Sequence, residues 1–311
     1  MAAIVAVDIG GTQIRAAAYP KDDVHPIKIQ RTATVAGDAD VFERMTSLID
    51  SVWPEEQVEA ISVAAAGPLD PETGIIIDTP NIPGWKDFPL RGKLEEHFHV
   101  PIYVGNDANL AAVGEWRYGA GQGHHHVLYL TISTGIGGGV ISNDRLLEGA
   151  HGMAAELGHI VVLSDGPLCS CGVRGHLEAV ASGPAIARYI SEQIAMGRSS
   201  RLASSPNLSA REAAEAARLG DELAVEAFQR AGTYIGQAVA GFLHIFNPSI
   251  VIFGGGVSQS GAILFDPLRE AMQRSIMAPA YLDNLEIAIA RLGDDVGMLG
   301  ALAQARILLD K

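Results

Sequence analysis

Two segments of the chain carry the same hydrophobic pattern, about 120 residues apart. Residues 3–19 read AIVAVDIGGTQIRAAAY, and residues 127–141 read VLYLTISTGIGGGVI. In each, an apolar run rich in β-branched residues leads into a turn with Gly and Thr, and a second apolar run follows. This pattern is typical of a β-hairpin. Its repetition indicates two related α/β domains that face each other.

The other apolar patterns of the first part alternate between strand and helix. Short apolar runs bounded by turn residues indicate strands, and apolar residues three and four apart indicate helices. We expect strands near 3–8, 13–19, 26–35, 60–67 and 101–104, and helices near 41–53 and 107–116. Residues 70–85, with PETG near one end and PGW at the other, are predicted to be rich in turns.

The second part is Gly-rich up to residue 183 and then mostly helical. The patterns predict a buried strand running into glycines within 248–261, a strand at 285–291, and helices at 221–246, 262–276 and 297–310. Residues 198–210 form a polar loop. We expect a small N-terminal α/β domain from 1–120 plus 297–311, and a large C-terminal α/β domain from 121–296.

Composition narrows the class of protein. Of 311 residues, 48% are hydrophobic and 19% charged, as in a compact globular protein. The net charge of −14 argues against nucleic-acid or anionic-membrane partners, because no basic stripe is present to neutralise phosphates. Two cysteines make no disulfide framework and fit a reducing compartment. With no signal-peptide pattern and no apolar run of ~18 residues, we expect a cytoplasmic protein.

Three glycine-containing turns follow apolar runs: DIGGT at 8–12, STGIGGG at 133–139 and GGGVS at 254–258. Glycine lets backbone N–H groups approach an anion closely, so these turns are candidate phosphate sites. None fits the P-loop or the dinucleotide motif, and the first two lie between strands rather than before a helix. Asp8 could hold Mg²⁺ through water beside such a turn.

A candidate general base lies in VGND, residues 104–107. Asp107 follows a buried strand at the opening of a helix, where the helix dipole favours the ionised carboxylate. On the residues alone, a simple N-cap role for Asp107 is the better interpretation. Similarly, Glu156 and Glu178 alone would be read as solvated surface acids, Asn81 as a turn residue, and Gly67 as a turn glycine.

Both cysteines lie in CSCGVRGH, residues 169–176. A disulfide between positions i and i+2 is disfavoured, because their Cα atoms in an extended segment are roughly 6.6 Å apart with near-parallel Cβ vectors. A short Gly-rich loop with two thiols and a histidine indicates a metal site instead.

These motifs together resemble a known family. DIGGT and STGIGGG resemble the two phosphate loops of actin-like sugar kinases, and residues 132–159, with GIGGG, Gly149 and AELGH, resemble the signature of the ROK (repressor, open reading frame, kinase) family. The resemblance continues through CSCGVRGHLE to Ser182 and Gly183 and extends from residue 3 to the last helix. It implies an α/β fold of two actin-like (ribonuclease H-like) domains with a cleft between them.

The resemblance also implies an activity, the transfer of the γ-phosphoryl group of ATP to the 6-hydroxyl of a hexose. Asp107 would be the catalytic base. The substrate-binding residues would be Gly67, Asn81, Asn106, Asp107, Glu156, His159 and Glu178. The residues facing ATP and Mg²⁺ would be Asp8, Gly10, Gly11, Thr12, Thr134, Gly135, Gly137, Gly255 and Gly256.

The ROK resemblance assigns the cysteine loop to structural Zn²⁺. Members commonly carry C-x-C-G-x-x-G-C with a fourth ligand from the upstream G-H pair, and here His176 stands where the third cysteine would be. Imidazole is a good zinc donor, so His159, Cys169, Cys171 and His176 could form a closed Cys₂His₂ site. The alternative is that the substitution accompanies a weakened or absent site.

Three functions follow from the resemblance. TPNIPGW and VGNDAN resemble the glucokinase branch, which favours glucose, and N-acetylmannosamine or another N-acylhexosamine is the alternative substrate. A sugar-responsive repressor is disfavoured by the start of the chain at the first strand and by the net charge. A catalytically inactive sugar sensor is disfavoured by Asp8, Asp107 and the three turns. Such proteins are commonly homodimers or homotetramers, and we expect the same here.

Overall fold

A computed structural model describes residues 2–36, 40–79 and 82–310, and its contacts divide the chain into two compact units. Unit 1 comprises Met1–Gly123, Arg145–Ala155 and Arg291–Lys311, and unit 2 comprises His124–Asp144 and Glu156–Ala290. This division differs from the expected domain boundaries chiefly in the segment 145–155. The predicted boundaries themselves stay a prediction.

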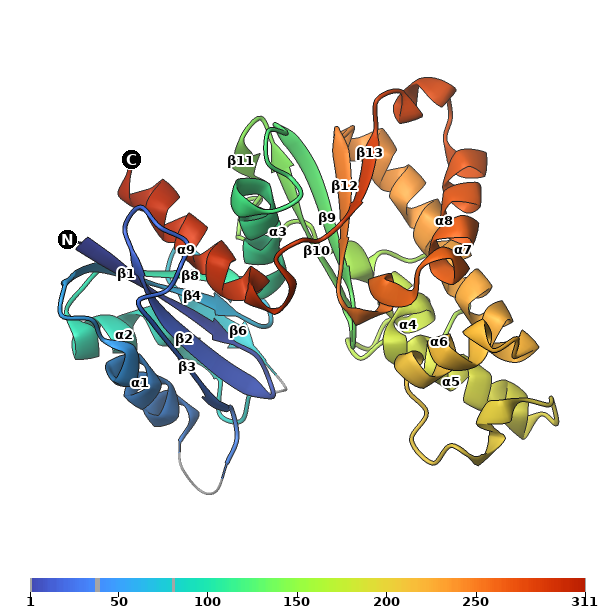
Figure 1. Cartoon of the computed structure of the whole chain (residues 1–311), viewed down its shortest axis with the longest axis horizontal. Coiled ribbons are helices and arrows are strands. Elements are labelled where there is room, and N and C mark those ends of the chain that lie inside the picture. The colour runs from blue at the N-terminus through green and yellow to red at the C-terminus, as the bar shows by residue number, and fades with distance from the viewer. Residues whose placement is uncertain (1, 37–39, 80–81, 311) are drawn as a thin grey trace. The chain divides into compact units, whose positions relative to one another are not determined.

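Unit 1 is built on a five-stranded sheet in the order β3-β2-β1-β4-β8 (Figure 1). Its strands are β1 (Ala2–Ile9), β2 (Gln13–Pro20), β3 (Lys28–Ala33), β4 (Gln57–Ala65) and β8 (Ile102–Asn106). β1 and β2 form the predicted antiparallel hairpin, with Asp8 opposite Arg15. β4 and β8 continue the sheet in parallel.

The central strand β1 is buried on both faces because nearly all of its side chains are apolar. Val5, Val7 and Ile9 belong to one core with residues of α1 (Val41–Val52) and α2 (Leu90–Phe98). Ile4 and Ala6 alternate to the opposite face, as the strand period of two requires. They pack there with residues of α3 (Asp107–Tyr118) and α9 (Val296–Leu309).

Residues 70–85, predicted to be rich in turns, contain more regular strand structure than expected. They contribute to a small antiparallel sheet of β5 (Leu69–Asp70), β6 (Ile75–Asp78) and β7 (Lys86–Pro89), of which β7 follows this stretch and leads directly into α2. The turn-rich prediction is confirmed at residues 71–74, which form a turn, whereas the strand β6 between the turns was not predicted. Unit 1 also contains the short strand β11 (Arg145–Leu146) and the 3₁₀ turn η5 (Gly293–Asp295).

Unit 2 repeats the central arrangement of unit 1. Its strands β9 (His126–Ile132), β10 (Ile136–Ser142), β12 (Ile250–Gly254) and β13 (Glu286–Ile289) lie in the order β10-β9-β12-β13. β9 and β10 form an antiparallel hairpin, and β12 and β13 add in parallel. The duplicated hairpin predicted from the sequence is confirmed.

Helices make up most of the rest of unit 2. They are η1 (Leu157–His159), α4 (Leu177–Ala181), α5 (Gly183–Ala195), η2 (Arg201–Ser204), α6 (Ala210–Arg218), α7 (Glu222–Phe246), η3 (Gly256–Ser260), α8 (Ala262–Ser275) and η4 (Pro279–Leu282). The long helix α7 packs against α8 at Gly232 and Gly236, where a Cβ atom would lie 2.5 Å and 2.2 Å from carbonyl oxygens of α8. Within the described ranges, no helix is long and apolar enough to cross a membrane.

Candidate active site

The first glycine turn, Gly10–Gln13, is closed by a hydrogen bond from Gly10 N to Gln13 O at 3.0 Å. Thr34, the residue directly after β3, holds the turn. Its backbone N–H donates to Thr12 O at 2.9 Å, and its hydroxyl donates to Gly10 O. Thr34 is fully buried, whereas Thr12 is exposed. The turn is thus preformed, and its anchor Thr34 belongs to no motif that the sequence analysis could recognise.

Asp8, at the end of β1, has an unusual environment. Burial raises the pKa of Asp8 to about 6, and the Arg15 guanidinium on the paired strand opposes part of this rise. Gly297 in the first turn of α9 lies against the carboxyl group, because a Cβ atom there would be 2.7 Å from Asp8 Cγ. The same Arg15 donates to Asp294 O and forms an ion pair with Asp295. Gly297 is a site residue that the sequence analysis missed.

The junction of β8 and α3 separates the roles of Asn106 and Asp107. The Asn106 side chain is the N-cap and accepts from Ala108 N at 3.0 Å and Asn109 N at 3.1 Å. Asp107 is instead the first residue of the helix, and its Oδ1 also accepts from Ala108 N, at 2.8 Å. The interpretation of Asp107 as a simple N-cap is therefore wrong.

The same junction includes Gly67. Asn106 Nδ2 donates to Gly67 O at 3.2 Å. Gly67 has φ +95°, and a Cβ atom on it would lie 2.5 Å from Asp78 O, so no other residue fits without rearrangement. The structure thus brings Gly67, Asn106 and Asp107 together, while Asn81 lies outside the described residues.

The second glycine turn, Ser133–Ile136, connects β9 to β10. Ser133 N donates to Gly135 O, and Gly183 N at the start of α5 donates to Ser133 O, both at 2.8 Å. Thr134 is exposed beside a cavity of about 610 Å³, which Gly256 also lines. Gly137 lies inside β10 and pairs with Thr131, so it is a strand residue rather than a turn residue.

The cavity beside this turn is formed largely by residues that the sequence analysis did not select. Its other lining residues are Ser133, Gly183, Pro184, Ala187, Leu208, Ser209, Ala210, Arg211, Ala214, Arg218, Val257, Gln259 and Ser260. Apart from Ser133, Leu208 and Ser209, they come from α5, α6 and η3. Ordinary helix-start signals such as Pro184 indicate helices without showing that they converge. Gly255 does not line the cavity. Its φ of +82° and a would-be Cβ 2.3 Å from Ile132 O give it a packing role.

The ELGH run packs directly on β10. Gly158 allows this contact, because a Cβ atom on it would lie 1.9 Å from Ile136 O. Leu157 lies over Gly138, where a Cβ atom would come within 2.5 Å of Leu157 Cδ1. Glu156 is exposed just before η1, and His159 ends it. Gly138 of GIGGG and Gly158 of ELGH therefore allow the ELGH turn to pack closely on β10.

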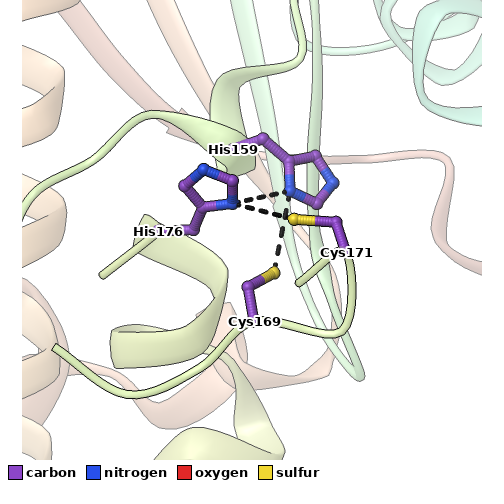
Figure 2. Close-up of side chains that lie close together, drawn as sticks. All are labelled: His159, Cys169, Cys171 and His176. Carbon is purple, nitrogen blue, oxygen red and sulfur yellow. Dashed lines mark hydrogen bonds between the residues drawn. The ribbon is translucent and has the colours of Figure 1, made fainter. Parts of the chain in front are cut away.

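The metal-ligand candidates of unit 2 converge. His159, Cys169, Cys171 and His176 each place one donor atom within 4.8 Å of the others, and Figure 2 shows the side chains pointing toward one another. The two Nδ1 atoms are 3.2 Å apart, and Cys171 Sγ is 3.2 Å from His176 Nδ1. Two nitrogen ligands about 2.0 Å from a tetrahedral zinc ion lie roughly 3.3 Å apart, so the donor set fits zinc.

The electrostatics of this cluster also suit a metal. Both cysteines are free thiols. Burial lowers the pKa of His176, and the neighbouring His159 lowers it further, which favours the neutral imidazole that a metal requires. Burial raises the pKa of the Cys169 thiol above its ordinary value, with the Glu178 carboxylate acting in the same direction. A cation bound beside the thiol would favour its thiolate form.

Glu178 lies between the cluster and the second glycine turn. Its Oε1 accepts from Ser170 Oγ at 3.3 Å and from Cys169 Sγ at 3.6 Å. Its Oε2 accepts from Ile136 N at 3.0 Å. The interpretation of Glu178 as a solvated acid is wrong, because both oxygens have partners within the protein.

Comparison with known protein families tests the resemblance of these motifs to the ROK family. The sequence model of the ROK family matches residues 4–307. The chain belongs to the ROK family. This ROK protein is 41% identical over 303 residues to a glucokinase of Thermotoga maritima, with 96% of this chain and 95% of that protein covered.

Two solved ROK structures are similar over nearly the whole chain. One is a ROK family glucokinase from Streptomyces griseus in complex with glucose and AMPPNP, with 35% identity, a TM-score of 0.82, and 98% and 99% of the two chains covered. The other is a ROK hexokinase from Thermus thermophilus, with 35% identity, a TM-score of 0.85, and 99% and 100% covered. The predicted α/β fold class with actin-like (ribonuclease H-like) domains is confirmed for this ROK protein.

Proposed function

We propose that this ROK protein is an ATP-dependent glucokinase, which transfers the γ-phosphoryl group of ATP to the 6-hydroxyl of glucose. The products are glucose 6-phosphate, ADP and a proton. The observation that carries the proposal is the β8–α3 junction, where Asn106 makes the N-cap and Asp107 becomes the first helical residue. A carboxylate there is stabilised by the helix dipole and can accept the hydroxyl proton during transfer.

The nucleotide roles fall on both units. We assign the phosphates to Gly10, Gly11 and Thr12 of the first glycine turn, and to Thr134, Gly135 and Gly137 around the second. Asp8 would hold Mg²⁺ through water. We assign the nucleoside to the cavity of about 610 Å³ in unit 2, near Gly255 and Gly256. Backbone N–H groups in such turns stabilise charge that develops on the transferred phosphoryl group.

The sugar roles also fall on both units. In unit 1 they are assigned to Gly67, Asn81, Asn106 and Asp107, and in unit 2 to Glu156, His159 and Glu178. Carboxylates accept from adjacent sugar hydroxyls, and amides both donate and accept. Holding the sugar in one orientation turns the transfer into an effectively unimolecular step.

His159, Cys169, Cys171 and His176 would hold structural Zn²⁺. The ion would close a loop that carries no regular secondary structure, and so orient His159 for the sugar. All four positions are protein donors, so this site would supply no open position for water. Self-association as a homodimer or homotetramer also belongs to this proposal, and light scattering in solution checks it.

ADP release tests the activity. Wild-type protein is assayed with MgATP and glucose, mannose, N-acetylglucosamine, N-acetylmannosamine or fructose, and we expect the highest kcat/KM with glucose. Asp107→Ala should lower kcat by at least 10³-fold. Calorimetry should still detect glucose binding to this variant. Asp22→Ala, an exposed aspartate of the same unit, serves as the control and should keep wild-type kcat.

Two results would overturn the proposal. Wild-type turnover that is fastest with an N-acylhexosamine would move the protein to the alternative substrate class. Full turnover by Asp107→Ala would remove the assigned base.

A further inference from the structure

Glu178 connects two loops to which different functions are assigned. Its Oε1 faces the cysteine loop and accepts from Ser170 Oγ at 3.3 Å and Cys169 Sγ at 3.6 Å. Its Oε2 faces the second glycine turn and accepts from Ile136 N at 3.0 Å. Glu178 lies in the first turn of α4, directly after His176 and Leu177, so the metal cluster and this carboxylate share one short stretch of backbone.

Besides accepting the hydrogen bond from Ile136 N, the Glu178 carboxylate also lies directly against Gly135 of the turn. A Cβ atom on Gly135 would lie 2.5 Å from Glu178 Oε2 and 3.4 Å from Cδ, and beyond the chain neighbours Thr134 and Ile136 no other described residue contributes an atom within 4 Å. A methyl group at position 135 would therefore press on the Glu178 carboxylate. Gly135 has no positive φ, so alanine is compatible with its backbone.

The other end of the turn is held by the start of α5, which follows α4 after one residue. Gly183 N donates to Ser133 O at 2.8 Å, and a Cβ atom on Gly183 would lie 3.0 Å from that oxygen. Ser182 N in turn donates to Glu178 O at 3.1 Å, which links the two contacts through one turn of backbone. The conformation of Thr134 and Gly135 thus depends on Glu178 at one side and Gly183 at the other.

We propose that Glu178 is a positioning residue for the nucleotide, which fixes the second glycine turn and transmits the order of the cysteine loop to it. This rests on the proposed function in that the turn receives the phosphates of ATP. The inference goes beyond a sugar contact for Glu178, because it predicts an effect on nucleotide affinity when no sugar is present. A carboxylate that accepts a backbone N–H bond is a strong anchor, since charge-assisted bonds are the stronger class.

Calorimetric binding of AMPPNP with Mg²⁺, without sugar, tests the proposal directly. Glu178→Ala removes both contacts and should weaken AMPPNP binding about tenfold. Glu178→Gln keeps a carbonyl oxygen for Ile136 N, and its amide can donate to Ser170 Oγ. Glu178→Gln should therefore bind AMPPNP within about twofold of wild type, while its affinity for glucose falls, because an amide is a poorer acceptor for sugar hydroxyls than a carboxylate.

A double-mutant cycle with Gly135 isolates the contact. Gly135→Ala in the wild-type background pushes the carboxylate out of place and should weaken AMPPNP binding by a similar factor. In the Glu178→Ala background the atoms that would clash are gone, so Gly135→Ala should have little further effect. Gly241→Ala in α7, where a Cβ atom meets open space, is the control and should bind as wild type does.

The outcomes separate this inference from the proposed function. Glu178→Ala with wild-type AMPPNP affinity, or Gly135→Ala with the same effect in both backgrounds, would overturn the inference, as would wild-type protein that fails to bind AMPPNP. Wild-type protein that binds AMPPNP but does not phosphorylate glucose would overturn the proposed function alone. If Glu178→Ala fails to fold, as judged by circular dichroism, the Gln variant and Gly135→Ala decide: equal and unchanged AMPPNP binding by both refutes the inference.

Discussion

At the scale of single residues, the position of Asp8 explains why residue 297, which lies in a helix and not in a turn, is a glycine. Gly297 is a helical residue, yet the space for its Cβ atom is occupied by the Asp8 carboxyl group, whose atoms would lie 2.7–2.9 Å away. The approach brings the N-terminus of α9 next to the acid, where the helix dipole favours negative charge. Asp8 is thus placed by β1, Arg15 and α9 together.

Gly297→Ala should separate function from stability. Alanine is the better helix former by ~1 kcal/mol, which offsets part of the overpacking cost of ~1–3 kcal/mol. We expect a small change in Tm but a fall of about tenfold in kcat/KM for MgATP, because the carboxyl group must move. Steady-state kinetics with varied MgATP measures this. Gly92→Ala in α2, where the added Cβ meets open space, is the control, and a variant with unchanged kinetics would contradict the proposed role of Asp8.

The raised pKa of Asp8 predicts a pH dependence of stability. The pKa of Asp8 is about 6 in the folded protein and 3.8 in the unfolded chain. Between these pH values the folded protein keeps a proton on Asp8 that the unfolded chain has lost. The cost of burying the charge is absent below pH 3.8 and complete above about pH 6, where it reaches about 3 kcal/mol. Asp8→Asn should therefore raise Tm by several degrees at pH 7.5, and this gain should vanish near pH 4. Calorimetric scans without Mg²⁺ and ATP test it; a gain that is the same at both pH values would contradict the assignment.

The sequence predicted the residues of local motifs and missed those defined by tertiary contact. The two cysteines, His159 and His176 were selected because they lie in one short signature, and the structure brings their donor atoms together. Thr34 anchors the first glycine turn from the end of β3, 22 residues after Thr12, and Gly297 approaches Asp8 from the opposite end of the chain. Nothing in their own neighbourhoods indicates these contacts, because the fold creates them.

At the scale of secondary-structure elements, the strength of the periodic pattern determined which elements could be predicted. The long helices α7 and α9 and both hairpins were expected within one or two residues of their observed bounds. The strands β5 to β7 are only two to four residues long, too short to establish a period. Helix α2 has Pro89 at its N-cap and no side-chain capping bond, so the usual start signal is missing.

Helices α3 and α9 cross within unit 1 at two glycines. A Cβ atom on Gly300 would lie 2.0 Å from Leu110 O, and one on Gly114 would lie 3.0 Å from Gly300 N. The two backbones are therefore in direct contact, which no larger residue permits. Since α3 begins with Asp107, this crossing also determines where the proposed base lies.

Gly300→Ala should destabilise unit 1 despite the better helix propensity of alanine. Insertion of a methyl group against the carbonyl oxygen forces the helices apart and costs ~1–3 kcal/mol or more. We expect Tm to fall by several degrees and kcat to fall with it, because α3 carries Asp107. Thermal unfolding followed by circular dichroism measures the first effect. Gly92→Ala again provides the matched control in the same unit, and a Gly300→Ala protein as stable as that control would disprove the tight crossing.

At the scale of the whole molecule, the two units share one chain but differ in their spectroscopic probes. The chain passes between them after Gly123, Asp144, Ala155 and Ala290. All three tryptophans of the protein, Trp53, Trp85 and Trp116, lie in unit 1. Tryptophan emission therefore reports on unit 1 alone, whereas far-ultraviolet circular dichroism reports on both.

The repeated architecture was predictable because each hairpin carries its own local pattern. The segment 145–155 was not, since its contacts with unit 1 depend on packing such as that of Gly152 against Pro71, where a Cβ atom would lie 2.0 Å from the proline ring. The ring and the glycine are far apart in sequence and share no motif. Local signals thus indicate the elements, and the grouping of elements into units requires the fold.

Metal removal should act on unit 2 and spare unit 1. The cysteine loop is held by scattered bonds such as Cys169 N to Val173 O at 2.8 Å, so loss of a tetrahedral ion should release it. Protein stripped with a chelator, and shown by elemental analysis to be zinc-free, should lose ellipticity at a lower temperature and show a higher KM for glucose. Its tryptophan emission at 25 °C should not change. Cys169→Ser/Cys171→Ser protein is the control, because the chelator should have no further effect on it. If zinc-free protein kept the same KM for glucose and lost ellipticity at the same temperature, a metal bound by the four donors would have no role in sugar binding.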